Sequence, residues 1–280
     1  MKTGLAIWHY PHRSVLENVR FFAAHGLQSV SLLGTDMAAL CRDSTLAAAL
    51  AEAVRSADLT LTVHHILPRS HSQEDVQTFR EQMELIADWQ RTYGLLHVYS
   101  FDVAQPIRDN ILPYLNEVLS RMPGCRVAVE DFGLNAAERA QLESLRGNPR
   151  FGYLVDIGHM FLRLTGRNDS GKTLFTHTDD EGPVCDAPDC QAFLRALKAR
   201  DFPVFEIHLH NNDGVQDMHY FLGDGALDVQ GVLRAIKAFG FDGVMTIESA
   251  PGFMFECVYP ESDRRILDTI GYYHRLWEQA

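Results

Sequence analysis

Eight short stretches of apolar and β-branched residues recur along the chain, separated by segments whose apolar residues follow helical spacing. The stretches cover residues 4–8, 28–33, 59–66, 94–100, 126–131, 152–158, 203–210 and 243–249. A strand followed by a helix, eight times over, predicts a parallel (β/α)8 barrel, or TIM barrel, with residues 1–280 as a single domain. A doubly wound sheet is the main alternative. No G-x-G-x-x-G motif follows the first strand, so a dinucleotide site is not supported.

One connection is much longer than the others. Residues 158–187 separate the sixth strand from the next predicted helix, and long loops in compact domains often serve as lids or binding loops. A disordered insertion is the alternative. The apolar residues Met160, Phe161, Leu162 and Leu164 favour a packed lid over a disordered segment.

Composition and charge narrow the expected partners. The net charge is −12 and no basic run exceeds the pair Arg264 and Arg265, which disfavours nucleic acid as a partner. The first residues hold one short apolar run followed at once by His, Pro and Arg, so we expect no signal peptide, no membrane span and a cytoplasmic location. Five scattered cysteines are not typical of a disulfide framework. A small-molecule substrate is the expected partner, and a homo-oligomer is compatible with the sequence.

Potential metal ligands lie near the C-terminal ends of six predicted strands, where barrel enzymes place their reacting groups. They are His64 or His65, His97, Glu130, Asp156, His210 and Glu248. Side chains two apart on a strand share a face, so Thr62 and His64 should both face the lumen, which favours His64 over His65. The same alternation places His208 and His210 in the lumen, with His210 nearer the mouth and His208 as a packing residue.

Three carboxylates around one lumen need a physical explanation. A single inward histidine is more often a satisfied core residue than a ligand, and a single acid at a strand end is often a helix cap. Glu130, Asp156 and Glu248 together would repel one another and lose solvation unless a cation neutralised them. Carboxylates with one imidazole favour a divalent ion such as Mn²⁺, Co²⁺, Mg²⁺ or Zn²⁺, one or more per chain. A metal-free scaffold would leave the three acids unexplained.

The segments "VAVED", "YLVDIGHM", "HLHNNDGVQDMHYFLGDGALD" and "MTIES" resemble the signature segments of the xylose isomerase-like TIM-barrel superfamily. That group includes sugar and sugar-phosphate isomerases and epimerases, dehydratases and endonuclease IV-type phosphodiesterases. The resemblance runs from the first strand to the last helix. It implies that Glu130, Asp156, His210 and Glu248 are the metal ligands, and that His159 contacts the substrate or a second metal.

Two chemistries remain open, and both use this metal site. We favour an isomerase or epimerase of a small sugar, sugar phosphate or polyol, in which a metal-stabilised enediolate forms between two acid/base glutamates, Glu130 and Glu248, with His159 in a catalytic role. The alternative is a multi-metal, endonuclease IV-like hydrolase of a small phosphodiester. The additional ligands for it would be His64, His97, His159, Asp217 and His219. Dehydration of a cyclic polyol acid is a third reaction of the same type.

The loop after the seventh strand, "NNDGVQ", has no Arg or Lys to hold a phosphate. The basic residues of the long connection, Arg163, Arg167 and Lys172, are the alternative phosphate ligands.

Overall fold

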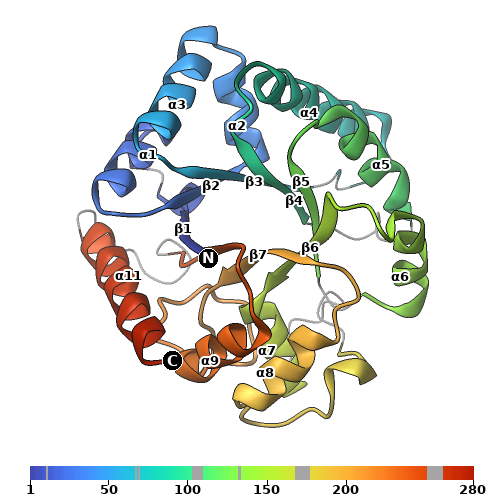
Figure 1. Cartoon of the computed structure of the whole chain (residues 1–280), viewed down its shortest axis with the longest axis vertical. Coiled ribbons are helices and arrows are strands. Elements are labelled where there is room, and N and C mark those ends of the chain that lie inside the picture. Colours follow the sequence, from blue (N-terminus) through green and yellow to red (C-terminus); the bar gives the residue numbers. More distant parts are fainter. Residues whose placement is uncertain are drawn as a thin grey trace.

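The computed structural model is a closed barrel of eight parallel strands inside a ring of helices (Figure 1). The strands are β1 Lys2–Ala6, β2 Ser29–Leu33, β3 Thr60–Ile66, β4 Leu96–Asp102, β5 Arg126–Glu130, β6 Phe151–Asp156, β7 Val204–Leu209 and β8 Val244–Ile247. Each strand pairs with the next, and β8 pairs with β1 to close the barrel. The predicted TIM-barrel fold is therefore confirmed. The structure describes residues 1–10, 12–66, 68, 70–102, 110–131, 134–167, 177–250 and 261–280, with only the backbone of His9.

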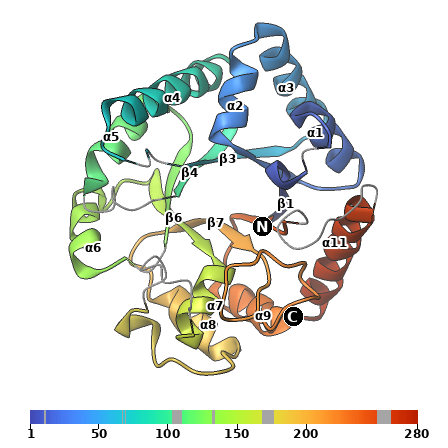
Figure 2. The ribbon, with the colours of Figure 1, turned by 180° about the vertical axis from the view of Figure 1, so that it is seen from behind.

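Helices follow the strands in chain order and cover the outside of the barrel (Figure 2). They are α1 Val15–Ala24, α2 Gly34–Cys41, α3 Ser44–Ser56, α4 Gln73–Tyr93, α5 Leu112–Arg121, α6 Ala136–Leu142, α7 Ile157–Thr165, α8 Cys190–Lys198, α9 Val229–Phe239 and α11 Glu261–Gln279, with short 3-10 turns η1 Ile7–His9, η3 Glu143–Leu145 and η4 Asp179–Glu181. Among the described residues, no helix is both long and apolar enough to cross a membrane.

Local sequence explains where several helices begin. Ser14 and Glu17 form a reciprocal capping box at the start of α1, and Asn135 with Glu138 does the same for α6. The outward-facing residues of the strands, such as Val63 and Val155, pack with the helices in one large apolar core. A second, small apolar cluster contains Ala128 and Leu154, which precede Glu130 and Asp156 by two residues and so share their face of the strand. Toward the C-terminal ends of β5 and β6, that face therefore becomes polar.

The long connection after β6 differs from expectation at its start. Residues 157–165 are not a loop but helix α7, which begins directly at the end of β6. Asp156 caps this helix by accepting a hydrogen bond from the backbone N–H of His159, and Gly166 ends it in the left-handed conformation with φ of 63°. The apolar residues that suggested a packed lid, including Met160 and Phe161, are buried in α7. A lid function for the rest of the connection stays a prediction, and residues 168–176 lie outside the described residues.

Candidate metal centre

Three carboxylates project into the lumen at the C-terminal ends of the strands. Glu130 is the last residue of β5, Asp156 is the last residue of β6, and Glu248 directly follows β8. Their exposed fractions are 3%, 0% and 7%, so each carboxylate is almost fully removed from water. Burial of this kind is costly unless the charges are compensated. The compensating groups present are histidines from β3, β7, α7 and the loop after β7.

The first group of potential ligands joins β5 to α7. His159 Nδ1 lies 2.8 Å from Glu130 Oε1 and 3.8 Å from Asp156 Oδ1. One potential ligand atom from each of these three residues falls within 4.8 Å of the others. Because Asp156 is the N-cap of α7, the first turn of the helix carries His159 over the end of β6, and a sequence separation of three residues is enough to bring them together.

A second group joins β6, β7 and β8. His208 Nδ1 lies 2.8 Å from Glu248 Oε2, and Asp156 completes a set with ligand atoms within 4.8 Å of one another. His208 does face the lumen, as the alternation predicts, but it contacts a candidate ligand and is more than a packing residue. Its other ring nitrogen lies 3.5 Å from Glu206 Oε1, deeper in the barrel, where Thr62 and Thr246 hydroxyls also donate to Glu206.

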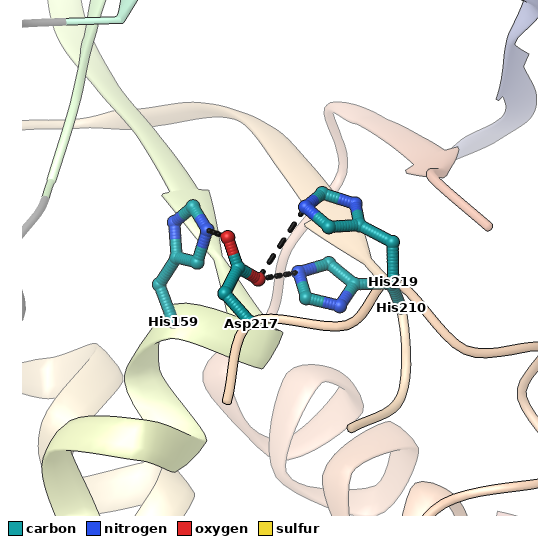
Figure 3. Close-up of side chains that lie close together, drawn as sticks. All are labelled: His159, His210, Asp217 and His219. Carbon is teal, nitrogen blue, oxygen red and sulfur yellow. Dashed lines mark hydrogen bonds and ion pairs between the residues drawn. The ribbon is translucent and has the colours of Figure 1, made fainter. Parts of the chain in front are cut away.

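The third group is built by the loop after β7 reaching back over the mouth (Figure 3). The Asp217 carboxylate points between three imidazoles. One of its oxygens lies 3.1 Å from His159 Nε2, and the other lies 3.6 Å from His210 Nε2 and 3.4 Å from His219 Nε2. The rings of His210 and His219 stack with centroids 3.9 Å apart. His219 has φ of 49°, a left-handed conformation that few non-glycine residues adopt and that is frequent at functional sites.

Two buried asparagines hold this loop in place. Asn211 donates to the Leu222 carbonyl and accepts from the Leu227 N–H, which fixes both ends of the loop. Asn212 donates to the carbonyl of Gly158 and so ties the loop to the first turn of α7. Sequence reasoning missed these residues, because a loop has no periodicity that distinguishes a structural amide from a solvated one.

His210 packs against the start of α7 with almost no free space. A Cβ placed on Gly158 would lie 2.0 Å from His210 Cε1. On its other side, His210 Nε2 lies 3.1 Å from Asp156 Oδ1. The glycine in the segment "DIGHM" therefore permits the imidazole to reach the carboxylate at the end of β6.

His64 lies at the edge of the site. Its Nε2 is 3.5 Å from Glu130 Oε2, its Nδ1 is 3.2 Å from the Ser100 hydroxyl, and its ring stacks on that of Trp8. His65 points outward, where it contacts the Tyr99 hydroxyl, so the preference for His64 agrees with the structure.

His97 is not brought to the site, contrary to expectation. It is exposed at the start of β4, where its electrostatic neighbours include Lys2 and Arg126, near the opposite end of the barrel. The strand begins at Leu96 and runs to Asp102, so a residue predicted near its C-terminal end lies at its N-terminal end. Asp102 takes the expected place, and its charge acts on Glu130.

The family model of the xylose isomerase-like TIM barrel matches residues 19–262, nearly the whole described barrel. The chain belongs to this family. An uncharacterised protein of Methanocaldococcus jannaschii is 27% identical over 143 residues, which cover 51% of this chain and 44% of that relative. The chain thus aligns with less than half of the length of the curated relative.

Several solved structures share the xylose isomerase-like barrel. A D-tagatose 3-epimerase-like protein superposes with a TM-score of 0.68 at 15% identity, covering 100% of this chain and 99% of its own. D-psicose 3-epimerase with D-tagatose from Clostridium cellulolyticum H10 gives 0.68 at 11% identity, covering 99% of both chains. The IOLI protein with a bound zinc atom gives 0.64 at 13% identity, covering 98% of this chain and 99% of its own. At these identities the likeness shows the fold.

Electrostatics in this xylose isomerase-like barrel favour a cation at the mouth. Burial raises the pKa of Glu130 to about 8, against the opposing effect of His159. Burial acts to lower the pKa of His159, but Asp156 and Asp217 outweigh it and raise that pKa well above the usual value. Burial acts to raise the pKa of Asp217, yet His159 and His219 hold it well below its usual range. Glu130 would therefore hold a proton near neutral pH unless another positive charge replaced that proton.

The donor set fits a divalent ion. Asp156 belongs to two of the three ligand groups, and its Oδ2 is buried without a hydrogen bond to any described residue. A buried carboxylate oxygen with no donor is rare in folded proteins and is often explained by an ion or a water. Mixed carboxylate and imidazole donors suit Mn²⁺, Co²⁺ or Zn²⁺. Of the four ligands expected from the sequence, Glu130 and Glu248 each share a ligand group with Asp156, and His210 Nε2 lies 3.1 Å from Asp156 Oδ1.

Proposed function

We propose that this chain is a divalent-metal-dependent isomerase or epimerase of a small sugar or polyol. The observation that carries the proposal is the shared position of Asp156, which links one group containing Glu130 to another containing Glu248. Two glutamates thereby flank a common candidate metal position from strands β5 and β8. Proton removal on one side of a substrate and proton return on the other side requires such a pair.

Each residue has a distinct role in this scheme. Glu130, Asp156, His210 and Glu248 would hold the ion, which when bound polarises a carbonyl and the neighbouring hydroxyl and lowers the cost of an enediolate. One glutamate takes the proton from the carbon beside the carbonyl, and the other returns a proton to the opposite face. His159, between Glu130 and Asp217, is placed to bind a substrate oxygen. The solved barrels named as 3-epimerases support ketohexoses as the first substrates to test.

The test follows proton exchange at carbon. The protein, loaded with Mn²⁺ or Co²⁺, is incubated in D2O with D-tagatose, D-psicose or D-fructose, and NMR follows loss of the C3 proton signal and appearance of the 3-epimer. Glu248→Gln should abolish exchange, while Glu143→Gln, at a half-exposed surface position, should leave it unchanged. Absence of exchange and of epimer for all three sugars, with the metal bound, would contradict this choice of substrates and reaction.

The third ligand group favours a second candidate, a multi-metal hydrolase of a small phosphodiester. His159, His210, Asp217 and His219 offer ligand atoms within 4.8 Å of one another, in addition to the groups around Asp156. Two or three ions held in this way would activate water and stabilise the leaving oxygen. Elemental analysis distinguishes the candidates: one ion per chain supports the epimerase. Two or more ions, together with cleavage of bis(4-nitrophenyl) phosphate, support the hydrolase.

A further inference from the structure

A buried cluster of four charged residues lies behind the candidate metal centre and shares no member with it. Its members are Asp131, Arg163, Glu181 and Arg200, here called the ion-pair quartet. Asp131, Arg163 and Glu181 are at most 3% exposed, the side chain of Arg200 is 3% exposed, and Arg163 is among the largest fully buried side chains of the described residues. Arg163 therefore does not hold a phosphate at the mouth, which was one expectation from the sequence.

The contacts of the quartet join four separate parts of the chain. Arg163, on α7, donates from Nε and Nη2 to Glu181 at 3.1 and 2.8 Å, and from Nη1 to the backbone carbonyl of Asp131 at 3.0 Å. Arg200, just after α8, donates to Glu181 at 2.6 Å and pairs with the Asp131 carboxylate. Two guanidinium groups thus neutralise two carboxylates at side chains that are 0 to 4% exposed.

Stability alone does not explain such a cluster. Apolar residues of similar volume often replace a buried ion pair with no loss of stability, whereas removal of one partner is costly. What an arginine offers in addition is geometry, because its planar guanidinium donates in fixed directions to several acceptors at once. Here those directions connect Glu181 to the backbone carbonyl of Asp131, while the Asp131 carboxylate lies farther away, 3.9 Å from Arg163 Nη2.

That carbonyl belongs to the residue after Glu130. The N–H of Asp131 continues the β5–β6 ladder by donating to Leu154 O at 3.0 Å, so the peptide group on each side of Asp131 is held. Arg163 also lies one helical turn after His159 on α7, about 5 to 6 Å along the helix axis. Two contacts therefore connect the end of β5 to α7: His159 with Glu130 at the mouth, and Arg163 with Asp131 behind it.

We propose that Arg163 is a positioning residue that fixes Glu130 and His159 relative to one another, with Glu181 and Arg200 holding its guanidinium in the required direction. The inference rests on the proposed metal-dependent function, because it assigns the quartet to the geometry of that site. It also gives a role to η4. This short turn lies far from β5 in the sequence, yet it carries Glu181, which holds Arg163 next to the residue that follows Glu130.

The experiment compares Arg163→Lys with a matched control, Arg139→Lys. Arg139 also pairs with an acid of η4, Asp180, but its side chain is a quarter exposed. Its guanidinium donates to the backbone carbonyl of Leu134, whereas that of Arg163 donates to the carbonyl of Asp131. Each purified protein is titrated with Co²⁺, whose visible absorption bands report ligand geometry, and its unfolding temperature is measured separately. Arg163→Lys should change the bands and weaken Co²⁺ binding about 10- to 100-fold, as loss of a group that orients a ligand does. Arg139→Lys should leave both unchanged.

Wild-type bands and affinity in folded Arg163→Lys would overturn the inference, even with a lower unfolding temperature, because Arg163 would then serve stability alone. If Arg163→Lys does not fold, Glu181→Gln gives the same test. It preserves the shape of Glu181 but weakens its hold on the guanidinium, and an unchanged Co²⁺ spectrum in it would be equally contrary. If the wild-type chain binds Co²⁺ and the variants weaken that binding as expected, but no proton exchange occurs in ketohexoses, only the proposed function is overturned. A wild-type chain that binds no Co²⁺ would overturn both.

Discussion

Replacement of Glu181 by glutamine should destabilise the protein in a manner that depends on pH. Burial opposes ionisation of this carboxyl, but Arg163 and Arg200 outweigh it and lower the pKa of Glu181 from 4.5 to about 2. At about 1.4 kcal/mol for each pH unit, the difference corresponds to about 3 kcal/mol of folding free energy. The cost of removing one partner from a buried ion pair, about 3 to 5 kcal/mol, is of the same size.

The sign follows from the lower pKa in the folded state. Ionised Glu181 contributes fully above pH 4.5, where it is charged in both the folded and unfolded chains. The contribution falls as the pH drops from 4.5 to about 2, because protonation then favours the unfolded chain. The difference in unfolding free energy between wild type and Glu181→Gln should therefore be largest at pH 5 to 7 and small near pH 2.

Urea unfolding followed by far-UV circular dichroism, repeated at pH 7, 5, 4 and 3, measures this difference. Glu143→Gln is the matched control, because Glu143 pairs with Arg146 at a half-exposed surface position, where an ion pair contributes little. A difference between wild type and Glu181→Gln that stays constant from pH 7 to pH 3 would refute the reasoning. Equal stability of the two proteins at pH 7 would refute it as well.

Three further predictions concern the candidate metal centre. Asp156→Ala should abolish metal retention while the barrel stays folded, whereas Asp186→Ala, the same change at an exposed side chain, should retain the metal. Full metal occupancy of Asp156→Ala, measured by elemental analysis, would reject the ligand assignment. If the third ligand group binds metal, His219→Ala should remove one ion per chain, as counted by elemental analysis. An unchanged ion count would mean that His219 is not a ligand of a second ion and only lies near a single one. Gly158→Ala should displace the His210 ring, lower the unfolding free energy by about 1 to 3 kcal/mol through overpacking, and weaken Co²⁺ binding. Gly223→Ala, whose added Cβ meets open space, should have none of these effects. Wild-type Co²⁺ affinity in Gly158→Ala would show that the ring adjusts freely.

The fold and much of the candidate site could be predicted because they depend on periodicity. Alternation along a strand determines which side chains enter the lumen, and the strand ends placed Glu130, Asp156 and Glu248 at one mouth. The same reasoning was wrong for His97, because an apolar stretch does not mark where a strand begins, and β4 starts two residues later than expected. Periodicity was also misinterpreted at the start of the long connection, which was predicted to be a loop. The helical spacing of the apolar residues after Asp156 predicts α7 equally well.

Contacts between distant segments could not be predicted in this way. The pairing of both Arg163 and Arg200 with Glu181 depends on how α7, η4 and the end of α8 pack. Nothing in their local sequence pairs a particular arginine with a particular acid. The contact of His208 with Glu248 depends on the stagger between β7 and β8, which sets the depth of each lumen residue. Periodicity gives the face of a residue but not its height in the barrel.

The loop after β7 has a consequence for how barrels of this kind diversify. The groups around Asp156 draw on the ends of strands β5 to β8, whose register is set by the closed sheet, so these ligands cannot shift position without moving a strand. Asp217 and His219 instead come from one loop, tied down by Asn211 and Asn212 and resting on a histidine of α7 that the barrel already supplies. Loops tolerate replacement far better than strands do. Under the proposed function, the number of ions at the mouth, and with it the reaction, can therefore change through exchange of this one loop while the strands stay the same.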